Sequence, residues 1–371
     1  PPPPPPRFLA LTVGRHLLAP PGADTSLLDD RFVCCADEGE ERLVRLAGVE
    51  RLRLSSFYRQ RVFERLESLA AADRDRAMLS ALHTLHTLSE EDGGLVAALR
   101  ELRFVPSASG TLHRPSELFH PRVREAGELL DVGEAYPAGV FGGEDVLGVL
   151  ERLGMRALIT RRAVLESARS IEQLAALEPE AARQRARALL RYIDEHSNAL
   201  IEFTPAGGPP TRSAKSAVSK LLSKLAPSAV EPSRDVADGD FCSELASRAW
   251  LPLLRERPEP YLPWPDEARR LPTAASASVR PREDAWLVSA SFGLLDGEAR
   301  SESLRRLLGW IAPPSLATPA TQLSALACQP APGELPHQQA MAIAVPALYR
   351  ALERSLVAAG AAGGGCAAVD A

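Results

Sequence analysis

Apolar residues recur every three or four positions in several stretches of the chain, a spacing that predicts amphipathic helices. The clearest stripe comprises Phe57 or Tyr58, Val62, Leu66 and Leu69, and Ser55 is its predicted N-cap. A second N-cap is predicted at Thr318. Helices are predicted over residues 43–49, 57–66, 73–88, 95–102, 150–154, 163–171, 178–200, 304–308, 322–326 and 338–357.

Short strand-like stretches separate these helices. The stretch from Leu102 to Pro115 predicts a hairpin, in which Gly110 closes the turn and Pro115 ends the second strand. Proline cannot donate to a strand ladder, and glycine adopts turn conformations that other residues avoid. Further strands are predicted over residues 8–13, 31–35 and 285–289, and turns over residues 37–41, 92–94 and 295–298.

Three of the predicted helices end in a glycine, the residue that most easily adopts a left-handed C-terminal cap. Each glycine is followed by one large apolar residue, and each helix is preceded by a strand-like stretch that carries an aromatic residue. The uneven spacing of the three sets excludes a solenoid of fixed period. We therefore predict a mixed α/β (α+β), helix-rich fold, in which short strands and hairpins alternate with helix pairs in repeated supersecondary units. The three sets are Phe32, Gly48 and Val49; Phe104, Gly154 and Met155; and Trp286, Gly309 and Trp310.

Shifts in composition along the chain predict two domains joined by a linker. The linker contains Gly207-Gly208-Pro209-Pro210, which disfavours regular structure, so proteolysis is expected to cut first between Gly207 and Arg234. The predicted segments are a Pro-rich tail at 1–6, an α/β domain at 7–203, a flexible linker with a lysine-bearing insert at 204–235, a second, smaller α/β domain with a Trp- and Pro-rich core at 236–357, and a disordered Ala- and Gly-rich tail at 358–371.

Composition limits the classes of partner and compartment. The 371 residues carry a formal net charge of −5, which gives no electrostatic reason to expect a nucleic-acid partner. No run approaches the roughly 18 apolar residues that cross a membrane. The five cysteines include no Cys-x-x-Cys pair, which argues against a zinc cluster or a disulfide framework and favours a reducing, cytoplasmic location. The chain begins with six prolines and no methionine, so we expect a fragment of a longer polypeptide whose neighbouring domains are its partners.

The candidate chemical sites all have simpler structural interpretations. His83 and His86 are spaced for one helical face, but no third metal ligand lies at a recognisable spacing. Cys34 and Cys35 are adjacent, so in a strand they point to opposite faces. The acidic run from Glu90 to Gly94 lacks the Lys-Ser/Thr of a phosphate-binding loop, and the chain has no Gly-x-Ser-x-Gly nucleophile motif. We predict no enzyme activity, and no catalytic, cofactor-binding or metal-binding residue.

Aromatic residues suggest a binding alternative in the C-terminal half. Trp250, Trp264, Trp286 and Trp310 all lie there, and prolines flank Trp264 on both sides. An aromatic and proline-rich surface could bind a peptide segment. Burial in the smaller second core is the simpler explanation, because each indole buries a large area there.

Several motifs, taken in order, resemble the repeating regions of the sacsin family of very large chaperone-like proteins. The resemblance spans roughly residues 30 to 330. The matching stretches are residues 57–66, 102–110, 115–121, 153–156, 167–170, 249–252, 262–264, 286–289, 295–298, 308–310 and 313–315.

The resemblance implies a position within a larger chaperone. In that family a repeating region begins with an Hsp90-like ATPase domain, whose Asn, Asp-x-Gly-x-Gly and lid motifs are missing here. This chain is therefore similar to the part that follows, and an Hsp90-like domain is expected upstream of Pro1. The family implies a role in protein folding and quality control with Hsp70 and unfolded clients. The sequence departs from the family at the insert 204–234 and at Cys34-Cys35.

Two interpretations remain open beside a non-catalytic scaffold. The chain could transmit nucleotide state from an upstream ATPase domain, as a middle domain does, with Arg59, Arg61 or Arg169 reaching the nucleotide phosphate. Alternatively, the tryptophan and proline surface binds peptides.

Overall fold

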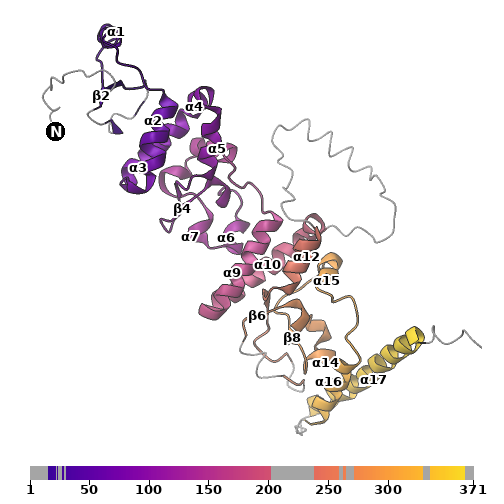
Figure 1. Ribbon diagram of the computed structural model, residues 1–371. Helices are drawn as coiled ribbons and strands as arrows, with labels where there is room; N and C mark the ends of the chain where they lie inside the picture. Colours follow the sequence, from indigo (N-terminus) through magenta and orange to yellow (C-terminus); the bar gives the residue numbers. More distant parts are fainter. Residues whose placement is uncertain are drawn as a thin grey trace, which may run out of the picture. The chain divides into compact units, whose positions relative to one another are not determined.

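The structure, a computed structural model, describes residues 16–21, 23, 27–28, 31–201, 238–258, 262–264, 271–328 and 335–363. The predicted strand at 8–13, the Pro-rich tail at 1–6 and the whole predicted linker at 204–235 lie outside these ranges. The fold is helix-rich, since 62% of the described residues are helical and 8% lie in strands, and it contains several small two-stranded sheets (Figure 1). No helix in the described part of the chain is both long enough and apolar enough to cross a membrane.

Backbone contacts divide the chain into two compact units. The first comprises the described residues of Pro1–Gly127 together with Asp131–Ala157, and the second those of Glu128–Leu130 and Leu158–Ala371. This division falls between Ala157 and Leu158, within the first of the two predicted domains.

The first unit begins with a parallel strand pair and a helical layer, followed by an antiparallel hairpin and a further helix. Strand β1 pairs with β2, and β3 pairs with β4. The elements are β1 (Leu17–Leu18), β2 (Phe32–Val33), α1 (Glu38–Leu46), α2 (Leu54–Phe57), the π-helix η2 (Tyr58–Val62), the 3-10 helix η3 (Phe63–Ser68), α3 (Ala71–His83), α4 (Leu85–Glu91), α5 (Gly93–Glu101), β3 (Val105–Pro106), β4 (Leu112–His113), η4 (Pro115–Glu117), α6 (Glu125–Leu129, at the division), α7 (Val132–Ala135), η5 (Gly139–Gly142) and α8 (Glu144–Arg152).

The core of the first unit confirms the predicted apolar stripe. Phe57, Tyr58 and Val62 are fully buried, Leu66 is nearly so and Leu69 is partly buried, in one cluster with residues of α3, α5 and α8. Phe104 packs edge-on against Phe141, with ring centroids 6.1 Å apart, and attaches the hairpin to this core. Buried aromatic rings of this size contribute much of a small core's hydrophobic stabilisation.

The second unit contains the long helices and two more small sheets. Helix α9 packs along α10, and α16 packs against α14 and α17. Its elements are α9 (Arg161–Leu177), α10 (Pro179–Leu200), α12 (Asp238–Ser247), β5 (Leu251–Pro252), antiparallel to β6 (Thr273–Ala274), η6 (Ser276–Ser278), β7 (Val279–Arg280), parallel to β8 (Gly293–Leu294), η7 (Arg282–Asp284), α14 (Ala285–Val288), α15 (Glu302–Leu307), α16 (Ala317–Ala327) and α17 (Leu335–Gly363).

The three predicted glycine endings adopt one hydrogen-bond pattern. Gly48, Gly154 and Gly309 follow α1, α8 and α15 with φ of 84°, 111° and 72°. In each case the next N–H donates to the carbonyl five residues earlier, which is the Schellman arrangement. These bonds are Val49 to Val44 (3.3 Å), Met155 to Leu150 (2.9 Å) and Trp310 to Arg305 (2.8 Å), and all three donors are buried residues.

Several local predictions were wrong at helix starts. The acidic stretch at 37–41 is not a turn but the start of α1, because Asp37 Oδ1 accepts the Glu40 N–H at 2.8 Å and caps the helix. Neither Ser55 nor Thr318 is an N-cap, since α2 follows Arg53 and α16 follows Leu316. Both predicted caps are instead buried within the first turn of their helices.

Two further elements differ from prediction. The stretch at 285–289, with Trp286, is not a strand, because Ala285–Val288 form a short helix that continues from η7. The helix predicted over 73–88 is interrupted at Thr84, whose hydroxyl donates to the Ser80 carbonyl at 2.8 Å. Such a side chain competes with the helical backbone for its own acceptors.

Candidate functional site

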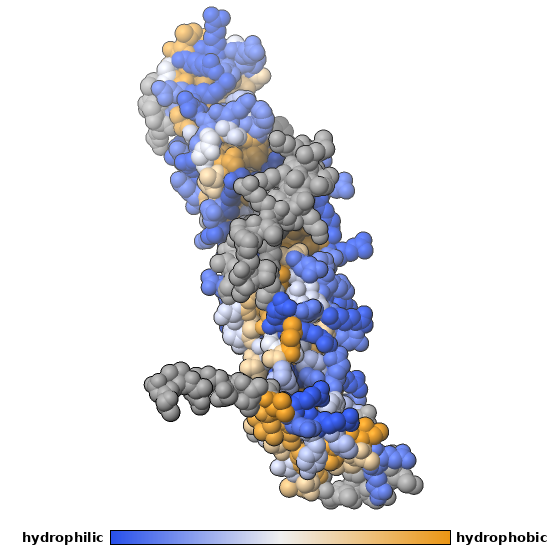
Figure 2. Space-filling view, turned by 90° about the vertical axis from the view of Figure 1, so that its right-hand side faces the viewer, coloured by the Kyte–Doolittle hydropathy of each residue, from blue (hydrophilic) through white to orange (hydrophobic). Residues whose placement is uncertain are grey.

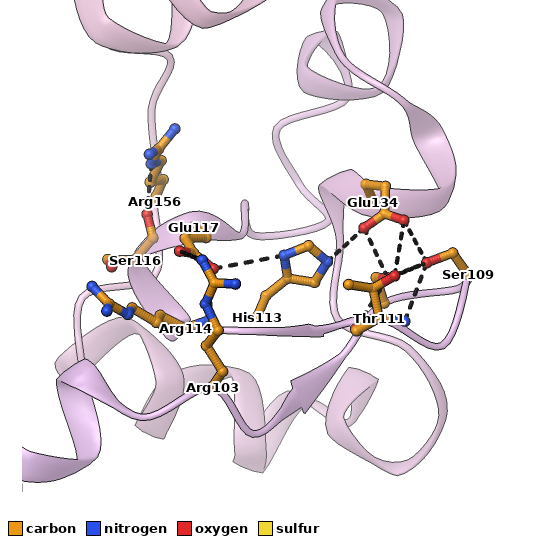
Figure 3. Close-up of polar contacts among 10 residues, drawn as sticks. Arg103, Ser109, Thr111, His113, Arg114, Ser116, Glu117, Glu134 and Arg156 are labelled. Atoms are coloured by element: carbon orange, nitrogen blue, oxygen red, sulfur yellow. Dashed lines mark hydrogen bonds and ion pairs between the residues drawn. The ribbon is translucent and has the colours of Figure 1, made fainter. Parts of the chain in front are cut away.

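A dense group of polar contacts lies where the β3–β4 hairpin meets α7 (Figure 3). We call it the Glu134 cluster. It comprises Ser107, Ser109, Thr111, His113, Glu117 and Glu134.

Local backbone structure brings these side chains together. Gly110 has a φ of 85° and closes the turn between the two strands, as predicted. Asp131 caps α7 by accepting the Gly133 N–H at 2.8 Å, which fixes the position of Glu134 one residue later. The Ser109 N–H donates to the Gly133 carbonyl at 3.1 Å, so the hairpin tip is attached directly to α7.

One carboxylate accepts from four side chains. Oε1 of Glu134 lies 2.5 Å from Ser109 Oγ and 3.3 Å from Thr111 Oγ1. Oε2 lies 3.3 Å from Ser107 Oγ and 2.6 Å from His113 Nε2. An ionised carboxylate can only accept, so the hydroxyls and the imidazole Nε2–H are the donors. Glu134 thereby connects both strands of the hairpin to α7.

These contacts favour the charged form of Glu134. The Ser109 hydroxyl lowers the pKa of this carboxyl group, burial opposes that effect, and His113 lowers the pKa further by hydrogen bonding and charge. The net result is a pKa below the ordinary value. Glu134 is therefore ionised at neutral pH.

Glu117 lies on the other side of the imidazole. Its Oε2 is 3.7 Å from His113 Nδ1 and accepts the Arg114 N–H at 3.0 Å, while Oε1 accepts from Arg103 at 3.0 Å. Burial raises the pKa of Glu117, but the Arg114 hydrogen bond and the Arg103 guanidinium outweigh it, so the pKa is lowered. The imidazole is thus held between two carboxylates.

The order of the groups differs from that of a nucleophilic triad. In a triad, the imidazole accepts the proton of the serine and the carboxylate orients the imidazole. Here Ser109 donates directly to Glu134, and His113 donates to the same carboxylate. A carboxylate with a lowered pKa is a weak base. The arrangement supports a structural role, in which Glu134 holds the hairpin and α7 together.

The histidine and cysteine candidates from the sequence are not brought together as a metal site. His83 is the last residue of α3, whereas His86 lies in α4 and is 3.5 Å from Glu90. Burial raises the pKa of the Cys35 thiol, and the negative charges of Glu40 and Glu41 raise it further. The thiol is therefore kept protonated. Among the described residues, no group of three His, Cys, Asp or Glu side chains could hold a metal ion.

The three candidate arginines each have an intramolecular contact. Arg59 Nη2 lies 2.7 Å from Asp92 Oδ2, and Arg169 Nη2 lies 2.6 Å from Glu244 Oε1. The Arg61 guanidinium lies over the Phe32 ring, 5.3 Å from its centroid.

The tryptophans of the second unit are largely in the core. Trp250 is fully buried and donates to the Leu245 carbonyl at 2.8 Å. Trp264 and Trp310 are 9% and 7% exposed, and Trp286 is half-buried.

Sequence reasoning missed the Glu134 cluster, although one signal was present. Residues 107, 109, 111 and 113 are all polar and alternate along the predicted hairpin, which places them on one face of it. Their acceptor lies more than twenty residues further on, in a helix of one turn, and no periodicity indicates that partner.

Comparison with known proteins gives no match. No family model, no curated protein and no solved structure matches the chain.

Proposed function

We propose that the chain is a non-catalytic scaffold and interaction segment of a sacsin-like molecular chaperone that takes part in protein folding and quality control with the Hsp70 system. Its partners would be neighbouring domains of the same long polypeptide, Hsp70 components and unfolded clients. The observation that carries the proposal is the ordered series of motifs between residues 30 and 330.

Contacts between two of these motifs support the proposal. Residues 115–121 and 153–156 are far apart in sequence, yet Phe119 and Arg156 form a parallel bridge. The Arg156 N–H donates to the Leu118 carbonyl and the His120 N–H to the Arg156 carbonyl, both at 2.9 Å. Motif residues that pair with one another are expected of an architectural unit.

We also propose that the short strands and helices form repeated supersecondary units. Support comes from the identical hydrogen bonds at Gly48, Gly154 and Gly309. In addition, residues 105–119 and 251–280 share an order of antiparallel strand pair, 3-10 turn and extended segment.

The non-catalytic part is tested by measuring ATP hydrolysis by the purified chain. We expect no rate above the protein-free background. Hydrolysis that a single substitution within the chain abolishes would overturn the proposal, because a contaminating ATPase would not respond to such a change.

The transmitter alternative depends on an arginine that reaches an upstream nucleotide. Arg169 is half-exposed although it pairs with Glu244, so a competing phosphate could still approach it. In a longer polypeptide that includes an ATPase domain, Arg169→Ala would then slow hydrolysis. Arg162→Ala is the matched control, since Arg162 is an exposed arginine on the same helix paired with Glu166.

The peptide-binding alternative has less support, because three of the four indoles offer little surface. It requires the tryptophan emission to shift when an unfolded client is added. An emission spectrum of buried indoles that a client leaves unchanged would exclude this alternative.

A further inference from the structure

Five arginines from four neighbouring segments gather around the η4 turn. We call them the arginine patch: Arg100, Arg103, Arg114, Arg152 and Arg156. Hydrogen bonds connect their segments. Arg100 Nη2 donates to the Arg152 carbonyl at 3.2 Å, and Arg156 Nε donates to the Ser116 carbonyl at 2.7 Å. Figure 3 shows Arg103, Arg114 and Arg156 around Glu117 and Ser116.

The patch carries more positive charge than its own acidic neighbours neutralise. Glu117 pairs with Arg103, and Glu101 pairs with Arg114 at 2.9 Å. Within the described part of the chain, no acidic side chain pairs with Arg100 or Arg152, and both are exposed. Arg100, Arg103, Arg114 and Arg152 therefore carry four positive charges, and Glu117 and Glu101 supply two negative charges, in a chain whose net charge is −5.

Exposure makes these groups accessible to a ligand. The Arg103 side chain is 63% exposed and that of Arg114 is 41% exposed. Guanidinium groups bind carboxylates through paired, charge-assisted hydrogen bonds, and they lose less hydration free energy than ammonium groups do. Figure 2 shows hydrophilic side chains over much of the described part of the face it displays.

The patch lacks what single-stranded nucleic acid needs. Such ligands stack their bases on exposed aromatic rings. The aromatic residues beside the patch, Phe104 and Phe119, are fully buried, and Arg156 covers the Phe119 ring at 5.2 Å.

We propose that the arginine patch is a docking surface for an acidic peptide segment, whose carboxylates bind Arg100, Arg152 and the outward-facing parts of Arg103 and Arg114. This inference rests on the proposed function only in treating the chain as an interaction segment. Its test does not use ATP hydrolysis, so either proposal can fail while the other stands.

The experiment measures the anisotropy of a fluorescein-labelled oligoglutamate peptide titrated with the full chain at low salt. The Arg100→Ala/Arg152→Ala double variant is expected to weaken binding about tenfold, which corresponds to about 1.4 kcal/mol. The single variant Arg152→Ala tests the same site with less risk of misfolding, because the Arg152 side chain is exposed. This variant should weaken binding by a smaller factor than the double variant.

Arg65→Ala is the matched control. Arg65 is an exposed arginine of the same unit and lies in η3. It should change the affinity by less than about twofold, as a distant surface substitution does. Equal weakening by Arg65→Ala, or no binding of oligoglutamate at low salt, would overturn the proposal. Tighter binding of a single-stranded oligonucleotide through the same arginines would overturn it as well.

Discussion

At the scale of single residues, Glu134 is the side chain that connects the hairpin to α7, because its carboxylate accepts hydrogen bonds from four side chains. Glu134→Gln keeps the shape but removes the charge and replaces one acceptor oxygen with a donor. Because the side chain is 38% exposed, we expect a loss of only about 1 kcal/mol in the free energy of unfolding. Urea unfolding measures it. Glu64→Gln, at an exposed position of the same unit, should leave the stability unchanged.

The same substitution should change the pH dependence of stability. The pKa values of Glu134 and Glu117 are both lowered in the folded chain. Their contribution is therefore fully present above the ordinary carboxyl pKa of about 4.5 and is lost as the pH falls through the lower folded values. Glu134→Gln should lose less stability than the wild type over that acid range. An unchanged acid slope would show that Glu134 does not contribute to it.

Burial was the most predictable property of individual residues. Tyr58, Val62 and Leu66 are buried because their spacing of four residues places them on one helical face, and the sequence shows that spacing directly. The polar contacts of Glu134 were not predictable, because hydrogen-bond partners from separate segments leave no periodic pattern.

At the scale of elements, the glycine that follows α8 permits a sharp test. Gly154 has a φ of 111°, and a Cβ there would make only an ordinary contact with Ser116, at 3.9 Å. Gly154→Ala should therefore destabilise the chain through backbone strain alone, by about 1–2 kcal/mol.

Gly148 is a second glycine of this region, and the expected effect of replacing it has the opposite sign. It lies inside α8, and a Cβ at this position would meet nothing within 4 Å. Gly148→Ala should stabilise the chain by about 0.5–1 kcal/mol, because alanine loses less backbone entropy in a helix. Thermal unfolding of the two variants compares them. Stabilisation by Gly154→Ala would show that the left-handed cap is not required.

Helix ends were predicted better than helix starts. The C-terminal glycines were identified because few residues other than glycine adopt a positive φ readily. At the starts, Asp37 lay within a run of acidic residues that also resembles a turn, and Ser55 was one of several polar residues able to cap. The short helix around Trp286 follows a 3-10 turn, and its apolar sequence suits a strand equally well.

At the scale of the whole molecule, the spacing of apolar residues predicted a helix-rich fold, but composition did not predict its division between Ala157 and Leu158. The sequence shows no Pro- or Gly-rich break there. Contacts among segments distant in sequence determine a compact unit, whereas composition reports only local breaks. The hairpin at 102–115 was predicted because its turn and strand signals are local in the sequence. Its attachment to α7 was not predicted, because that contact joins segments distant in sequence.

Net charge leads to a prediction for the complete chain. Its pI is about 5.9, so repulsion between molecules is weakest near that pH. Light scattering at fixed protein concentration should therefore be greatest near pH 6 and fall on both sides. Arg65→Glu makes the net charge more negative at an exposed site, so the maximum should move to lower pH. If instead the maximum stays in place or lies above pH 7, local patches such as the five arginines, rather than net charge, govern self-association.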